Sequence, residues 1–510
     1  MRRLECGIGA GLLVLLLAGC GREEEDAPAT VVRPRRAPPV SAPRPPVEAA
    51  PVPAPRPVDP APVEAVAPPA TPPVPEASPP EPVKAEEPPP APAPEPASPP
   101  PAPPEPPKEP EKPPPPPVLP LAARVDRAIG RGVGFLKSRA AALPVYYEGD
   151  PYVCRTEELV LWTFVHAGVP EADPDFDRLL KKMLDAPLER TYGVALQAMI
   201  LEELDRAKHQ RRIAQCAQFL LDNQCANGQW AYGDPSVFVD EIPQLPKSTA
   251  TAPARPKPGA PPPPGTRIKP EVRIRIKVQA RRTGPEKGDN SNSQYAALGL
   301  RACHDAGIVL PREATERAIA WWRSSQKADS AAKVERLELD GEPPRLFRGT
   351  TVAAQTVTAA PQGWCYEDHS DHAAYGSMTA GAVGSLCIYD YILDPKGSGW
   401  RKDKHVHRGL QWMARRFTVT ANPGRYEFGG GEDTREQYYY YLYALERAAI
   451  LYGTERLGAR RWYPEGAEVL VAEQGEDGSW NATEPVADTC FAILFLRRAT
   501  LPLVASVDRK

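Results

Sequence analysis

Residues 219–230 read FLLDNQCANGQW, and residues 469–480 read VLVAEQGEDGSW. Both have an apolar pair, a glutamine five residues after its first member, and a Gly-x-Trp turn whose tryptophan follows the glutamine by six positions. Weaker copies begin at Phe135 and Trp412, and a further helix pair is implied around residues 176–204. The clearest glutamine and tryptophan pairs are Gln224 with Trp230, Gln326 with an insertion-displaced Trp364, and Gln474 with Trp480. This recurrence indicates repeated helix pairs.

The two helices of each repeat differ in their apolar pattern. Residues 312–326 have a single apolar face, as expected of an outer helix, whereas residues 289–307, 377–393, 435–450 and 488–499 are apolar nearly all round, as expected of buried helices. An outer ring of amphipathic helices around an inner ring of buried ones follows. Closure of about five or six pairs on themselves leaves no exposed end that needs a cap. The sequence therefore predicts an all-α fold, an α/α toroid over residues 121–510.

The repeated pattern resembles the QW motif of squalene-hopene cyclases, which prenyltransferase β-subunits share. It also resembles the prenyltransferase/squalene-oxidase repeat proteins, an uncharacterised subgroup. The resemblance covers residues 121–510 and implies the toroid architecture, although the basic residue that often opens a QW motif is missing here. Glutamine side chains can bond unsatisfied backbone groups at a helix end, and the tryptophan can pack over the turn. We expect the motif residues to be structural.

The first nineteen residues are typical of a signal peptide. A basic start precedes LLVLLL at residues 12–17, which is too short to span a bilayer. Residues 17–20, LAGC, match the lipobox of bacterial lipoproteins, which implies that Cys20 carries the lipid and becomes the mature N-terminus. The alternative is an ordinary secretory signal. We expect attachment to a membrane in the cell envelope, at the periplasmic face of the inner or outer membrane or at the cell surface.

Residues 20–120 hold the lipidated cysteine and a tether that contains most of the chain's 67 prolines. Proline removes amide donors, so this segment is predicted to be disordered. Insertions at about 235–287 and 327–361 contain alternating stretches that are typical of strands. We expect these strands to form one small β-sheet flap at a mouth of the toroid. Spacing alone assigns no disulfide, and Cys216 with Cys225 is the first pair to examine.

Polar residues open the predicted inner helices. If these helices run parallel, their N-termini gather at one end, where unpaired amides favour a ligand. The candidates at this end are Arg155, Glu157, Tyr192, Asp289, Asn292, Asp371, Tyr375, Asp433, Arg435, Glu436, Tyr438 and Asp488. Asp289, Ser377 and Asp488 can equally be helix caps.

Known catalytic motifs of the resembled families are missing. The chain has no Asp-x-Asp-Asp, and the nearest pattern is DPDFD at residues 173–177. Asp488 and Cys490 match the start of a prenyltransferase zinc site, but the last histidine of the chain is His407, so none follows. Carboxylates such as Asp371, Asp433 and Glu436 leave a glycan-cleaving site open. The weak metal candidates are Cys365, His369 and His372.

The net charge of −3 selects no partner class. A nucleic-acid binder needs a concentrated basic face, and only residues 267–287 are basic. The interpretation is therefore a membrane-anchored envelope protein that binds a hydrophobic ligand, a glycan or a protein, with no cofactor, no nucleic acid and no cyclase chemistry. The alternative is an enzyme that acts on an isoprenoid or a glycan.

Overall fold

The computed structural model describes seven stretches of the chain, all within the unit Lys108–Lys510, one of two compact units. These stretches are residues 119–143, 156–244, 269–328, 333–339, 355–367, 372–425 and 431–503. The predicted signal peptide, Cys20 and the proline-rich tether up to residue 118 lie outside them.

The described residues are predominantly helical, as the periodicity predicted. The odd-numbered helices are α1 (Leu121–Arg139), α3 (Pro174–Asp185), α5 (Gln210–Asp222), α7 (Arg312–Ser324), α9 (Lys404–Arg415) and α11 (Trp462–Glu473). The even-numbered helices are α2 (Thr156–Ala167), α4 (Thr191–Asp205), α6 (Asn290–Asp305), α8 (Gly376–Leu393), α10 (Tyr438–Tyr452) and α12 (Pro485–Arg497). Three short 3-10 helices are η1 (Ala140–Ala142), η2 (Val237–Glu241) and η3 (Gly399–Lys402). The even-numbered helices bury most of their residues, and α10 buries every one.

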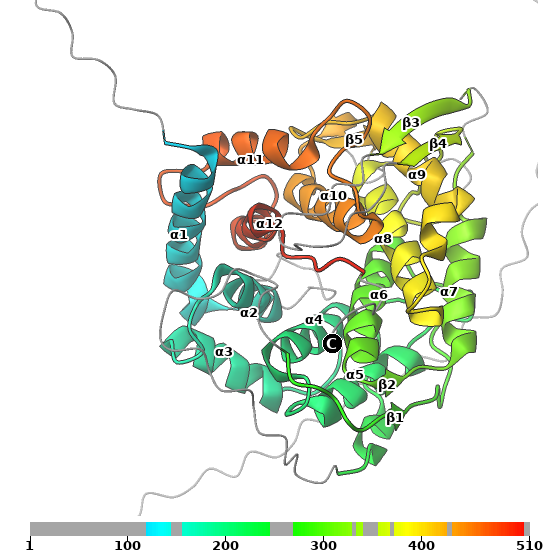
Figure 1. Ribbon diagram of the computed structural model, residues 1–510. Coiled ribbons are helices and arrows are strands. Elements are labelled where there is room, and N and C mark those ends of the chain that lie inside the picture. Colours follow the sequence, from blue (N-terminus) through cyan, green and yellow to red (C-terminus); the bar gives the residue numbers. More distant parts are fainter. Residues whose placement is uncertain are drawn as a thin grey trace, which may run out of the picture. The chain divides into compact units, whose positions relative to one another are not determined.

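The even-numbered helices pack against one another in sequence order. Helices α2, α4, α6, α8, α10 and α12 each contact the next, and α12 also packs against α2. The odd-numbered helices lie outside them, as Figure 1 shows. Helix α1 packs against α11 and α12, so the first and last helices of the described chain are neighbours.

Each motif tryptophan joins the helix before its turn to the helix after it. The indole N–H groups donate to main-chain carbonyls of the preceding odd-numbered helices: Trp230 to Leu220 (2.7 Å), Trp364 to Trp322 (2.7 Å) and Trp480 to Leu470 (2.8 Å). Their own backbone N–H groups donate to hydroxyls of the following even-numbered helices, which are Ser293, Thr379 and Thr489. All three indoles are fully buried. The tryptophans are therefore structural, with every polar group satisfied.

The motif glutamines join consecutive odd-numbered helices. Their side-chain amides donate to carbonyls of the next such helix: Gln224 to Ala314 in α7 (2.8 Å), Gln326 to His405 in α9 (3.0 Å) and Gln474 to Ala128 in α1 (2.8 Å). The third bond therefore runs from the turn after α11 back to α1.

Two motif glycines are required by conformation and by space. Gly228 and Gly478 have φ values of +96° and +90°, which favour glycine. A Cβ would lie 2.4 Å from the carbonyl oxygen of Arg317 at Gly228, and 2.5 Å from that of Arg131 at Gly478. Each turn is thus pressed against the next odd-numbered helix, the same helix that its glutamine contacts.

The strands form three separate sheets, and the prediction of one flap was wrong. Strand β1 (Ile276–Lys277) pairs in parallel with β2 (Ile308–Val309), while β3 (Glu335–Leu339) pairs antiparallel with β4 (Gln355–Ala359) and β5 (Asn422–Arg425) with β6 (Glu432–Thr434). Each strand finds its hydrogen-bond partners nearby. Main-chain groups in residues 307–309, after α6, bond those of β1, whereas β3 and β4 bond each other and pack against α9.

Six described cysteines are free and buried. They include Cys216 and Cys225, where burial raises the pKa to about 12 and about 11. Such thiols are inert and serve as small core residues. No helix among the described residues combines the length and the apolar character that a bilayer crossing needs.

Replacing Trp480 with phenylalanine tests the indole bond. The change leaves the buried carbonyl of Leu470 without its donor, so we expect the free energy of unfolding to fall by about 1–3 kcal/mol in urea denaturation of the full chain. Trp400→Phe is the matched control, because the buried indole N–H of Trp400 has no partner within the described stretches. An equal loss in both variants would attribute the effect to ring volume and contradict the role of the bond.

Candidate functional site

Three inner helices meet at their N-terminal ends through tyrosines. The hydroxyl of Tyr192 at the start of α4 donates to Ser291 in α6 (2.6 Å), and Ser291 also bonds the Tyr440 hydroxyl in α10 (2.8 Å). Aromatic rings fill the space between these helices: the centroids of Tyr192 and Tyr295 are 4.8 Å apart, and those of Tyr440 and Phe491 5.4 Å. Of the predicted residues at this end, Tyr192 therefore reaches the centre, where it packs against other side chains.

Two of the predicted carboxylates bind backbone amides. Asp289 caps α6 and accepts from the backbone N–H (2.7 Å) and the side-chain amide (2.8 Å) of Asn292. Burial raises the pKa of Asp289 to about 6. Asp488 accepts from the N–H groups of residues 482, 483 and 484, while Glu484 caps α12. Asp289 is therefore a helix cap, as predicted, and Asn292 and Asp488 support the starts of α6 and α12. The prediction of caps at Asp488 and Ser377 was wrong, because these residues lie inside α12 and α8, whose N-caps are Glu484 and Tyr375.

Arg435 and Tyr438 lie together at the edge of α10. The Arg435 guanidinium binds both carboxylate oxygens of Glu473 at 2.9 and 3.0 Å and lies 4.2 Å from the centroid of the Tyr438 ring. Tyr438 itself donates to the carbonyl of Val419 (2.5 Å). This pair is a local tie between α10 and the end of α11.

The other predicted residues occupy separate local positions. Asp433, at φ +51°, accepts from the N–H of Gly424, and Glu157 pairs with Lys182 at 2.8 Å. Tyr375 is buried at the start of α8, and Glu436 accepts from Asn422 through its backbone carbonyl. Arg155 and Asp371 lie outside the described residues.

The metal candidates are not brought together in the described chain. Cys365 is buried and its Sγ contacts the carbonyl of Glu367 in its own loop. His369 lies outside the described residues, whereas His372 is among them. Within the described stretches, no three His, Cys, Asp or Glu side chains are grouped as a metal site requires.

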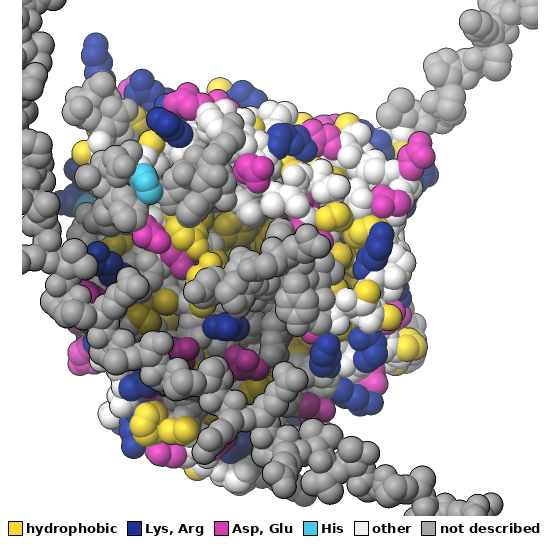
Figure 2. Space-filling view, turned by 180° about the vertical axis from the view of Figure 1, so that it is seen from behind, with side chains coloured by type: hydrophobic (Ala, Val, Ile, Leu, Met, Phe, Trp, Pro, Cys, Tyr) yellow, Lys and Arg dark blue, Asp and Glu magenta, His cyan; other side chains and the backbone are white. Residues whose placement is uncertain are grey.

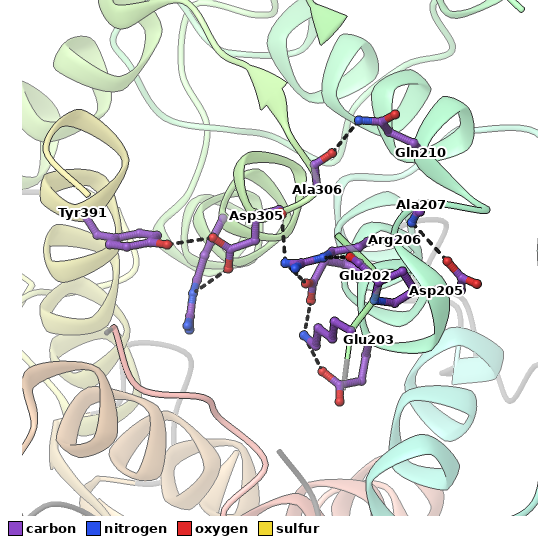
Figure 3. Close-up of polar contacts among 12 residues, drawn as sticks. Glu202, Glu203, Asp205, Arg206, Ala207, Gln210, Asp305, Ala306 and Tyr391 are labelled. Carbon is purple, nitrogen blue, oxygen red and sulfur yellow. Dashed lines mark hydrogen bonds and ion pairs between the residues drawn. The ribbon is translucent and has the colours of Figure 1, made fainter. Parts of the chain in front are cut away.

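A charged cluster that sequence reasoning missed lies at the C-terminal ends of α4 and α6 (Figure 3). The Lys269 ammonium is 2.5 Å from Glu202 and 2.7 Å from Glu203. Burial raises the pKa of Glu202, although the charge of Lys269 opposes that rise. Burial alone lowers the pKa of Lys269, but the two carboxylates raise it above its ordinary value. We call Glu202, Glu203 and Lys269 the acid–lysine cluster.

Asp305 extends this cluster across α6 toward α8. It accepts from the Tyr391 hydroxyl at 2.9 Å, and Arg301 lies 3.6 Å away (Figure 3). Arg206 bonds the carbonyl of Asp305 (3.2 Å) and lies 3.7 Å from Glu202. Every charged side chain here therefore faces a group of opposite charge or a hydrogen-bond partner.

A cavity of about 60 Å³ adjoins the acid–lysine cluster. Its apolar wall consists of Trp162, Met199, Leu298, Ala302 and Tyr443, and its charged wall holds the cluster with Arg301 and Asp305. The indole N–H of Trp162 donates to the Tyr443 hydroxyl (3.1 Å) and so joins α2 to α10. The arrangement offers an apolar surface beside a charged one at the C-terminal ends of α4 and α6.

The segment after α12 forms part of the wall of this cavity. Ala499, Thr500 and Leu501 line it, and Figure 1 shows the red chain running from α12 toward α6. The N–H and hydroxyl of Thr500 donate to the two carboxylate oxygens of Glu446, at 3.0 and 2.7 Å. Burial raises the pKa of Glu446 to about 7. The available sequence signal was the charged pair Glu446–Arg447 inside an otherwise apolar run.

The visible surface carries both signs of charge. On the face in Figure 2, Lys and Arg side chains are interspersed with Asp and Glu, beside hydrophobic side chains. Comparison of the chain with protein-family models and with curated proteins gives no match.

Replacing Glu446 with glutamine tests the contact with Thr500. Glutamine is always neutral: its oxygen can still accept from the Thr500 N–H, and its NH₂ group can donate to the Thr500 hydroxyl instead of accepting from it. The pKa of Glu446 in the folded protein is about 7, which exceeds its pKa in the unfolded chain. Its contribution to stability is therefore fully present below the unfolded pKa and is lost as the pH rises through about 7. We expect the free energy of unfolding of E446Q to exceed that of the wild type by about 3 kcal/mol at pH 8 and to equal it near pH 4.

Urea denaturation at both pH values measures this difference. Glu313→Gln, on the exposed side of α7, is the matched control, and we expect it to change stability by less than about 0.5 kcal/mol at either pH. A pH-independent effect of E446Q would contradict the buried, neutral state of Glu446.

Proposed function

We propose that this protein is a lipid-anchored envelope protein whose helical unit is an α/α toroid that binds a ligand without cyclase chemistry. The observation that carries the proposal is the cavity that has an apolar wall beside the acid–lysine cluster and is also lined by residues 499–501.

The packing of the helices supports the toroid. Inner helix α12 contacts α2, and the glutamine bond from the turn after α11 to α1 continues the series that runs from α5 to α7 and from α7 to α9. A two-ring arrangement satisfies both series of contacts. It also accords with the resemblance of the repeated motif to the squalene-cyclase and prenyltransferase repeats.

The contents of the centre support binding over cyclisation. Ligand sites of drug size commonly enclose about 300–1,000 Å³, whereas this cavity holds about 60 Å³. Tyrosine and phenylalanine rings fill the N-terminal side. The lining suits a ligand with an apolar body and a hydrogen-bonding end, and we propose that residues 499–501 move aside to give such a ligand the room that the cavity lacks.

The main alternative is a glycan-cleaving enzyme. Glycosidases use two neighbouring carboxylates, one of them with a raised pKa. Glu202 has a raised pKa and lies beside Glu203. Lys269 binds both carboxylates, which favours a structural role for the pair. Glycan hydrolysis by the wild type that disappears in E202Q would favour this alternative. Turnover of an isoprenoid would instead favour an isoprenoid-modifying enzyme, the other alternative that the family resemblance leaves open.

Native mass spectrometry of the full-length protein from membranes tests ligand binding. We expect a compound to accompany the wild type and to fall at least about fivefold in Ala302→Leu, because the added methyl groups fill the cavity lining. Ala320→Leu makes the same change on the exposed side of α7 and should retain the compound. Bare protein in all three preparations, or equal retention in both variants, would contradict the proposal.

Replacing Cys20 with serine tests the anchor separately. If the cysteine carries the lipid, the variant loses its acyl chains, and we expect it to move from the membrane fraction to the aqueous phase in detergent partitioning. Intact mass spectrometry should show the corresponding loss of acyl mass. An unchanged distribution and mass would contradict lipidation and leave ligand binding as a separate question.

A further inference from the structure

Arg447 is a buried cation at the centre of the inner helices. It lies on α10 with 3% of its surface exposed. Its guanidinium carbon is 4.1 Å from the centroid of the Tyr443 ring and 5.7 Å from that of Tyr295. Within the described residues it makes no ion pair, and both carboxylate oxygens of the neighbouring Glu446 accept from Thr500. A buried guanidinium that no carboxylate neutralises in an ion pair is costly, so the site calls for a compensating negative group.

Two N–H donors at this point have no acceptor among the described residues. Arg447 Nη2 donates to Gln294 Oε1 at 2.8 Å, whereas Arg447 Nη1 and Gln294 Nε2 are buried without a hydrogen-bond partner. The amide orientation is fixed, because its oxygen faces Arg447. The atom of this amide without a partner is therefore its nitrogen. Both unpaired atoms, Arg447 Nη1 and Gln294 Nε2, are hydrogen-bond donors.

The same two side chains line a small cavity between α6, α8 and α10. The cavity holds about 10 Å³ and is otherwise lined by Leu298, Ser385, Leu451 and other residues of α8. Gly381 makes room for the amide, since a Cβ there would lie 2.5 Å from Gln294 Oε1. The hydroxyl of Ser385 already donates to the carbonyl of Gly381 at 2.8 Å. A space of this size suits a single small species.

We propose that this cavity binds a monatomic anion, chloride, between Arg447 and Gln294. A halide accepts from Arg447 Nη1 and Gln294 Nε2 at once and neutralises the buried guanidinium, and it needs no acceptor in return. The site is separate from the cavity with the acid–lysine cluster, although Leu298 lines both. It holds α6, α8 and α10 together in the interior, so chloride stabilises the folded unit.

Thermal unfolding of the full-length protein in sodium chloride and in sodium gluconate at equal ionic strength tests this site. Binding to the folded state alone raises the unfolding temperature, and we expect a rise of about 2 °C at tenfold saturation. Arg447→Met removes the charge and should abolish the chloride dependence. Arg435→Met, at the surface pair with Glu473, is the matched control and should keep it.

Crystals grown in sodium bromide give a second measurement that does not depend on the stability of the Arg447 variant. We expect an anomalous peak within hydrogen-bond distance of Arg447 Nη1 and Gln294 Nε2. An ordered water alone at this position, or no density, would overturn the proposal. So would equal chloride dependence in the wild type and in a folded R447M variant.

Discussion

The hydrogen bond from each motif glutamine to a main-chain carbonyl of the next odd-numbered helix is the contact on which the arrangement of helices depends. A glutamine amide placed after one helix reaches a carbonyl of the next, so the repeats are joined by side chains as well as by the covalent chain. Leaving such a carbonyl buried and unpaired costs free energy. The turn glycines at 228 and 478 permit this close approach, and the tryptophans join each turn to both of its helices.

The interior combines this regular frame with unusually placed charge. Glu446 and Arg447 are adjacent on a helix whose every residue is buried, and they face different partners: Thr500 for the carboxylate, Gln294 and two tyrosine rings for the guanidinium. Lys269 compensates Glu202 and Glu203 at the helix ends. These buried charged side chains make the interior polar at a few positions. At each position their hydrogen bonds hold a neighbouring helix or loop in place.

The two ends of the inner helices differ in what they offer. At the N-terminal end, the amides that make such an end attractive to anions are bound by Asp289, Asp488 and Glu484. At the C-terminal end, carboxylates and carbonyls gather, and cations from loops and from α6 offset them. The cavity lies at this second end because the segment after α12 and the lysine of an insertion meet there.

The sequence by itself determined the helix pairs, the motif residues and the cap at Asp289, because periodicity, Gly-x-Trp turns and capping chemistry act over a few neighbouring residues. The sequence did not predict which carbonyls Gln224 and Gln474 contact, nor that the strands of the insertions form separate sheets. Those contacts join residues that are distant in the chain. Tertiary structure alone brought Lys269 to Glu202 and Thr500 to Glu446. The stability of a buried charge depends on what surrounds it in three dimensions, and a linear pattern carries no record of that environment.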